Sequence, residues 1–222
     1  MKQMYRRTVR FGFMLLMSCI MPNAFADTKV HQENPGIQYE VKIGYPVFEK
    51  EPLLSAQVAE IVQQTLNNFN KDFFSANIPL YQQGFECIIS NTAVYEDIHH
   101  ISFLLKIYQY SGGAHGITTL IPVTFSKQTK KLLSLKEAVQ PAKKNWLSSL
   151  SAEARRLLNE QVTKGSFSSN QSWIEKGTEP DQENFAVFTL EKDAVRIIFS
   201  QYQVGPYSSG MPEIVLPRTF FK

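Results

Sequence analysis

The chain has 222 residues, 43% of them hydrophobic, with 23 Lys and Arg against 20 Asp and Glu. This length provides one sizeable core, or two small lobes that share a core. Four of the basic residues and none of the acidic ones fall within residues 1–26, so the remainder holds 19 basic and 20 acidic residues, a net charge of −1. The sequence therefore lacks a broad basic field, which argues against a nucleic-acid partner.

The N-terminus has the three parts of a secretory signal. A basic stretch is followed by the apolar run 11–21 and by the small-x-small sequence Ala24-Phe25-Ala26. We therefore predict a signal peptide over residues 1–26, cleaved after Ala26, and export to the periplasm or out of the cell. The apolar run is too short for an ordinary spanning helix, and we expect no transmembrane helix in the mature chain. A lipoprotein attached through Cys19 is the less favoured alternative, because Met17 fits the lipoprotein pattern poorly.

A strand and a long helix are predicted after the signal. Residues 27–36 are polar and include Pro35-Gly36, and we interpret them as a flexible lead-in. A strand is expected over 38–48, followed by a helix for which Ser55 is the candidate N-cap. Helical spacing places one apolar stripe on this helix, formed by Val58, Ile61, Val62, Leu66, Phe69 and Phe73.

Three runs of alternating apolar and polar residues follow, over 85–96, 101–110 and 117–125, and each predicts a strand. Pro122 lies in the third run and indicates an edge strand or a bulge, because proline cannot donate a ladder hydrogen bond. Cys87 is the only cysteine of the mature chain, so an internal disulfide is impossible. We expect it to be a small buried residue; a reactive or intermolecular thiol is the alternative.

The second half predicts one more main helix and three more strands. Residues 132–139 favour a short helical turn, and 151–164 a helix with Ser151 as its candidate cap. Residues 165–183 are predicted as a loop, and the strands are expected over 185–190, 195–201 and 213–217. The fold class is therefore α+β, a mostly antiparallel sheet packed by two main helices. We expect a single domain over 37–222, with sub-lobes at about 37–82 and 83–222 as an option.

Two glycine-rich loops, 110–116 and 202–212, are the candidate binding site. Each lies next to a strand end and carries tyrosine, which contributes contact area at a low entropic cost when the loop is stiff. The alternative for 202–212 is a closing loop whose tyrosines pack on the sheet. The candidate contact residues are Tyr110, Ser111, Gly112, Gly113, His115, Tyr202, Pro206, Tyr207 and Ser208.

His115 has a catalytic, a metal-binding and a structural interpretation. No Gly-x-Ser-x-Gly elbow and no His-Glu-x-x-His motif occurs, so neither a nucleophile site nor a zinc site is indicated. We expect no metal and no cofactor. The structural interpretation is that glycines at 112, 113 and 116 adopt positive φ, and that the imidazole hydrogen-bonds the turned backbone. Asp97, His99 and His100 are likewise interpreted as a polar hairpin tip rather than an acid–base cluster.

These loops carry a resemblance to a known family. The stretches YSGGAHG (110–116), SKQTKKLLSL (126–135), FSQYQVGPYSSG (199–210) and EIVLP (213–217) together resemble the RsiV-type extracytoplasmic domain. That domain forms the extracellular part of the RsiV anti-sigma factor and also occurs in PdaC-type peptidoglycan deacetylases. The resemblance covers the chain from about Gln38 to its end.

The resemblance implies an α+β domain outside the membrane and linked to the cell envelope. In RsiV it implies lysozyme binding. In the deacetylases it places the chemistry in a separate metal-dependent domain, whose Asp-Asp and His-x-x-x-His motifs do not occur in this chain. We therefore predict an exported, non-enzymatic binding module whose partner is a lysozyme-like protein or peptidoglycan. The alternatives are an envelope hydrolase that uses His115 with a nearby carboxylate, and a structural or secretion-associated protein.

Overall fold

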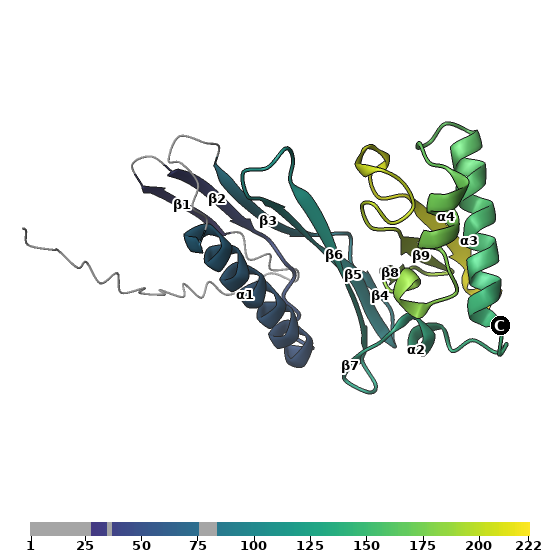
Figure 1. Ribbon diagram of the computed structural model, residues 1–222. Coiled ribbons are helices and arrows are strands. Elements are labelled where there is room, and N and C mark those ends of the chain that lie inside the picture. The colour runs from purple at the N-terminus through teal and green to yellow at the C-terminus, as the bar shows by residue number, and fades with distance from the viewer. Residues whose placement is uncertain (1–27, 35–36, 76–83) are drawn as a thin grey trace, which may run out of the picture.

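The computed structural model describes residues 28–34, 37–75 and 84–222 and contains two sheets (Figure 1). The first lobe, residues 28–132, has the strand order β1-β2-β3-β5-β6-β7, with β4 paired to β5. The second lobe, residues 133–222, has the order β10-β9-β8. The first sheet comprises β1 (Thr28–Asn34), β2 (Ile37–Ile43), β3 (Phe85–Asn91), β4 (Tyr95–Glu96), β5 (His100–Tyr110), β6 (Ile117–Ser126) and β7 (Lys131–Leu132). The second comprises β8 (Phe188–Leu190), β9 (Ala194–Ile198) and β10 (Glu213–Pro217).

Every strand pair is antiparallel except β2 with β3. Helix α1 (Pro52–Ser75) lies between these two strands in the chain, because a parallel pair needs a long crossover connection. The other helices are α2 (Leu135–Val139), α3 (Trp146–Thr163) and α4 (Gln171–Gly177), together with 3-10 turns at Gln182–Phe185, Tyr207–Ser209 and Arg218–Phe221. The predicted α+β class is confirmed.

Helix α1 covers one face of the first sheet. Its buried stripe packs against alternate residues of β3, β5 and β6, which point to the same face. The helix begins at Pro52, so Ser55 is not its cap; the Ser55 hydroxyl accepts from the Phe48 amide at 2.8 Å and donates to the Phe48 carbonyl at 3.0 Å. Because α1 and β3 share one core, a boundary between sub-lobes near residue 82 would cut through it.

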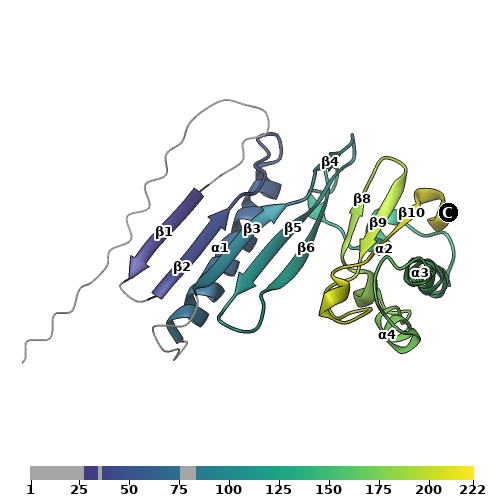
Figure 2. The ribbon, with the colours of Figure 1, turned by 90° about the horizontal axis from the view of Figure 1, so that it is seen from above.

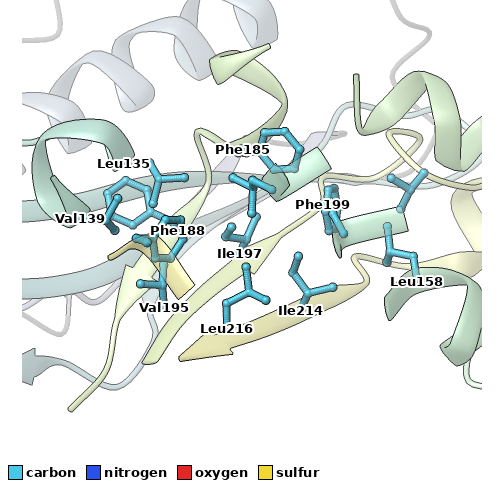
Figure 3. Close-up of a cluster of buried hydrophobic side chains, with 14 of the residues drawn as sticks. Leu135, Val139, Leu158, Phe185, Phe188, Val195, Ile197, Phe199, Ile214 and Leu216 are labelled. Atoms are coloured by element: carbon cyan, nitrogen blue, oxygen red, sulfur yellow. The ribbon is translucent and has the colours of Figure 1, made fainter. Parts of the chain in front are cut away.

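The core of the second lobe is separate and lies between its sheet and α2, α3 and α4 (Figure 3). Figure 3 shows Ile197, Ile214 and Leu216 of the sheet, with Leu158 of α3 and Phe185 close by. Ser151, the predicted cap of this helix, is instead buried within α3 and donates to the Thr178 carbonyl at 2.5 Å. Burial of apolar area on both sheets is the main driving force for this arrangement.

Two predicted irregular segments are regular. Thr28–Asn34, part of the predicted flexible lead-in, is strand β1 and pairs along its whole length with β2. The predicted loop 165–183 contains α4, which is capped by the Asn170 side chain through the Trp173 amide at 3.0 Å. The predicted signal peptide lies outside the described residues. Among the described residues, no helix has both the length and the apolar character required to cross a membrane.

The second lobe packs on the face of the first sheet that α1 leaves uncovered (Figure 2). Leu104 and Leu120 of the first sheet pack against Ile198. Ser102 Oγ accepts from the Leu190 amide at 2.8 Å and lies 2.8 Å from Thr124 Oγ1, so these two buried hydroxyls satisfy each other. The lobes are therefore joined by a small apolar patch and a buried polar contact at the middle of β5.

Candidate functional site

The two glycine-rich loops, 110–116 and 202–212, are far apart in the chain and meet at the edge of the lobe contact. Gln201 Oε1 accepts from the Thr118 amide at 3.0 Å, which ties the second-lobe loop to the start of β6. Tyr207 donates its hydroxyl to the Gly116 carbonyl at 2.9 Å. Tyr202 Oη lies 3.2 Å from His115 Nε2. We call Tyr108, His115, Tyr202 and Tyr207, which surround Gly116, the tyrosine–histidine cluster.

The His115 ring is exposed yet held on three sides. It stacks on Tyr207 with a centroid distance of 3.7 Å and an interplanar angle of 21°. Its Nδ1 lies 3.1 Å from the Gly116 carbonyl, which can only accept, so Nδ1 carries the proton. In the neutral ring Nε2 is then the acceptor of a hydrogen bond from the Tyr202 hydroxyl. Nε2 thus links the two loops, whereas Nδ1 bonds the turned backbone of its own loop, as the structural interpretation predicted.

Gly116 is the point at which the cluster is packed. It is buried, and a Cβ there would lie 2.4 Å from the ring of Tyr108, so only glycine leaves room for that ring. Of the three glycines predicted to need positive φ, only Gly112 adopts it, at 87°. Glycine is required at position 116 because the Tyr108 ring approaches it closely, and not because its backbone adopts a positive φ.

Tyr202 adopts a left-handed backbone with φ 66°, which is rare for a residue with a side chain. Its neighbour Gln203 donates to the carbonyls of Gly177 and Asn184, at 2.9 and 2.8 Å, and accepts from the Ser200 amide at 3.0 Å. Gln201 anchors the other side, as described above. The ring of Tyr202 is 45% exposed, so the loop holds an aromatic side chain in solvent despite a strained backbone.

The remaining predicted residues lie around this cluster. Tyr110 donates to the Gly113 carbonyl at 2.9 Å and so stabilises its own loop, whose Ser111 and Gly112 are exposed. Pro206 and Ser208 are exposed beside Tyr207. The sequence analysis did not identify Tyr108, Gln201 and Gln203, whose roles depend on contacts between distant segments.

The electrostatics of the region are mild. Burial, followed by the nearby Glu86 carboxylate, raises the pKa of Tyr108. Burial raises the pKa of the Cys87 thiol to about 11 and makes it a poor nucleophile, in line with the expected buried small residue. No group of three His, Cys, Asp or Glu with metal-binding geometry occurs among the described residues. The cluster is thus neutral, aromatic and rich in hydroxyls.

Two family profiles match separate parts of the chain. Residues 32–118 match the family described as deacetylase PdaC, and residues 125–219 match a protein family of unknown function, DUF3298. The boundary between the matches lies near the boundary between the two lobes. A curated relative, the peptidoglycan-N-acetylmuramic acid deacetylase PdaC of Bacillus subtilis, is 23% identical over 189 residues, which are 85% of this chain and 39% of the relative.

Two solved structures share the fold. A DUF3298 family protein from Pseudomonas aeruginosa PAO1 superposes with a TM-score of 0.62 at 16% identity and covers 91% of this chain and 93% of its own. A DUF3298 family member from Bacteroides fragilis gives a TM-score of 0.58, also at 16% identity, with coverages of 89% and 91%. Together the profile matches, the relative and the shared fold support a domain of the PdaC and DUF3298 type.

Proposed function

We propose that this protein is an exported, non-enzymatic module of the cell envelope that binds the glycan of peptidoglycan through its tyrosine–histidine cluster. The observation that carries the proposal is the stacked His115–Tyr207 pair with Tyr202 fixed beside it. Rings that are fixed before binding lose little conformational entropy on binding. The signal-like N-terminus and the similarity to an enzyme that acts on peptidoglycan support the location and the ligand class.

The chemistry of the cluster matches that of a sugar. A pyranose ring presents C–H groups on its faces and hydroxyl or amide groups on its rim. The flat rings of Tyr202 and Tyr207 offer apolar faces that can contact the C–H groups. Their hydroxyl groups, together with the exposed loop backbone at 111–113, can form hydrogen bonds with the groups on the rim of the sugar. The ring centroids of the two tyrosines are 5.8 Å apart, so both rings lie within reach of one sugar.

The contacts of His115 favour binding over catalysis. A general base needs a free lone pair directed at its substrate and is usually oriented by a third polar group. In His115, Nδ1 is engaged by the Gly116 carbonyl and Nε2 by the Tyr202 hydroxyl.

The proposal is tested by calorimetric titration of the purified protein with soluble peptidoglycan fragments and, in parallel, with lysozyme. We expect saturable glycan binding that Tyr202→Ala and Tyr207→Ala each weaken about tenfold, the effect of losing one aromatic contact. Ile98→Ala is the matched control, because Ile98 is 83% exposed and lies beyond the opposite end of β5 from Tyr110. Glycan affinity that is identical in all three variants, or binding of lysozyme alone, would refute it.

A further inference from the structure

The second lobe covers only part of the sheet face on which it packs. On this face of β5 the residues alternate as Ser102, Leu104, Lys106, Tyr108 and Tyr110. Ser102 and Leu104 are buried beneath the second lobe. Lys106 is exposed and Tyr108 half-buried. On this face the second lobe therefore covers Ser102 and Leu104, leaves Lys106 exposed, and contacts the sheet again at the tyrosine–histidine cluster.

The part of this face that the second lobe leaves uncovered reaches across three strands, β2, β3 and β5, in the described part of the chain. Register places Glu86 beside Tyr110, Ile88 beside Tyr108, and Lys42 beside Ile88. The side chains of this region are half-buried or exposed. We call it the open sheet face: Glu40, Lys42, Glu86, Ile88, Lys106 and Tyr110.

Tyr108 joins the open sheet face to the cluster. Its ring fills the space next to Gly116, whose carbonyl binds Tyr207, and Tyr108 also lies between Ile88 and Thr118 in the sheet register. The open sheet face thus begins directly beside the cluster. From β5 to β2 the face spans two strand spacings, about 10 Å at about 4.8 Å each, which is longer than one sugar ring.

We infer that the open sheet face binds further sugars of the same glycan strand, so that the protein recognises an extended chain rather than one terminal sugar. This inference rests on the proposed function. The charges of the face favour a glycan over a polyelectrolyte, because its two Glu and two Lys balance and Lys42 pairs with Glu40 at 2.8 Å. Its half-buried aromatic ring suits the face of an amino sugar, and its Glu and Lys side chains suit the hydroxyl, acetamido and lactyl carboxyl groups of peptidoglycan sugars.

The test is the dependence of affinity on glycan length. We would titrate the purified protein with peptidoglycan glycan fragments of two, four and six sugars. We expect the hexasaccharide to bind about tenfold more tightly than the disaccharide, since each added aromatic or charged contact contributes a few-fold. The double variant Glu86→Ala, Lys106→Ala should bring this ratio close to one. The matched control, Glu160→Ala with Lys164→Ala on the exposed side of α3, should retain it.

The outcomes separate this inference from the proposed function. Fragments that all bind with the same affinity would overturn the extended site and leave glycan binding in place. If none of the fragments binds, both the extended site and the proposed function are overturned. A third outcome is that the affinity of the native protein does not depend on glycan length and that the double variant changes the oligomeric state measured by sedimentation. This result would show that the face joins two copies of the chain, and it would also overturn the inference.

Discussion

The two ends of strand β5 both contact the second lobe, but with opposite chemistry. At the Tyr110 end, neutral aromatic rings and amide side chains join the lobes around Gly116. At the His100 end, the contact is ionic. Asp97 accepts from the amides of His99 and His100 at 2.7 and 2.6 Å and from the Tyr95 hydroxyl at 2.8 Å. Arg218 of the second lobe lies over the Tyr95 ring at 5.5 Å and 3.9 Å from Asp97.

This difference assigns different tasks to the two ends. At the His100 end two amides and one hydroxyl are directed at the Asp97 carboxylate, as expected for a polar hairpin tip. Arg218 and His100 lie at ion-pair distance from the same carboxylate, although Arg218 Nε and Nη2 and His100 Nδ1 make no hydrogen bond among the described residues. At the Tyr110 end, rings remain exposed although their backbone is strained. Strain and exposed apolar area oppose stability and are retained where they serve binding. We therefore expect the His100 end to contribute to stability and, under the proposed function, the Tyr110 end to bind the ligand.

The largest expected effect is on stability at the His100 end. Asp97→Ala removes the acceptor of two backbone amides and the Tyr95 hydroxyl. We expect a loss of about 3 kcal/mol, since each of these three partly exposed hydrogen bonds contributes about 1 kcal/mol. Chemical denaturation measures it. Glycan affinity should remain that of the native protein, and a weakened affinity with little loss of stability would reverse the assignment of the two ends.

The same end should make stability depend on pH. Burial acts to raise the pKa of Asp97, but the bonds from the His99 amide, Tyr95 and the His100 amide outweigh it and hold the pKa at about 2, against an ordinary 3.8. This stabilisation is complete above pH 3.8 and is lost as pH falls towards 2. Burial lowers the pKa of His100 below its ordinary 6.5; the charges of Arg218 and His99 lower it further, and Asp97 acts to raise it. The unfolded chain therefore binds this proton more readily than the folded protein, so stability also falls as pH drops below 6.5. The thermal unfolding midpoint should be highest at pH 7, lower at pH 5 and lowest at pH 3. Asp97→Asn should reduce the decrease in the midpoint between pH 5 and pH 3.

A smaller effect is expected from Gly116→Ala at the Tyr110 end. The added methyl group meets the Tyr108 ring at 2.4 Å, so the ring must move away. We expect a loss of about 1–2 kcal/mol, typical of overpacking, together with loss of glycan binding, because Tyr207 and His115 both bond to the Gly116 carbonyl. Gly165→Ala would be a poor control because of its φ of 72°. Gly44→Ala is the matched control, because it lies outside the two loops and its added methyl group would meet the Ile89 carbonyl oxygen at 3.9 Å, an ordinary contact distance.

Local patterns predicted the strands but not the anchoring of the loops. Alternation identified β3, β5 and β6, since each buries one face. The caps at Ser55 and Ser151 were wrong because both hydroxyls bind distant backbone groups, and that choice depends on packing. Helix α4 was missed because its seven residues bury only Ile174 and Gly177. The two loops were identified from Gly and Tyr, but Gln201 and Gln203 act on carbonyls and amides that only the folded chain brings near.

The smallest effect separates strain from contact at Tyr202. Tyr202→Ala and Tyr202→Gly remove the same ring, but only glycine adopts a φ of 66° without penalty. We expect the glycine variant to be more stable than the alanine variant by about 1 kcal/mol, the usual cost of a left-handed residue with a side chain. Both should lose glycan affinity equally, because both lose the ring that contacts His115. Equal stabilities would show that Gln201 and Gln203 do not hold Tyr202 under strain, whereas retained binding in either variant would remove Tyr202 from the site.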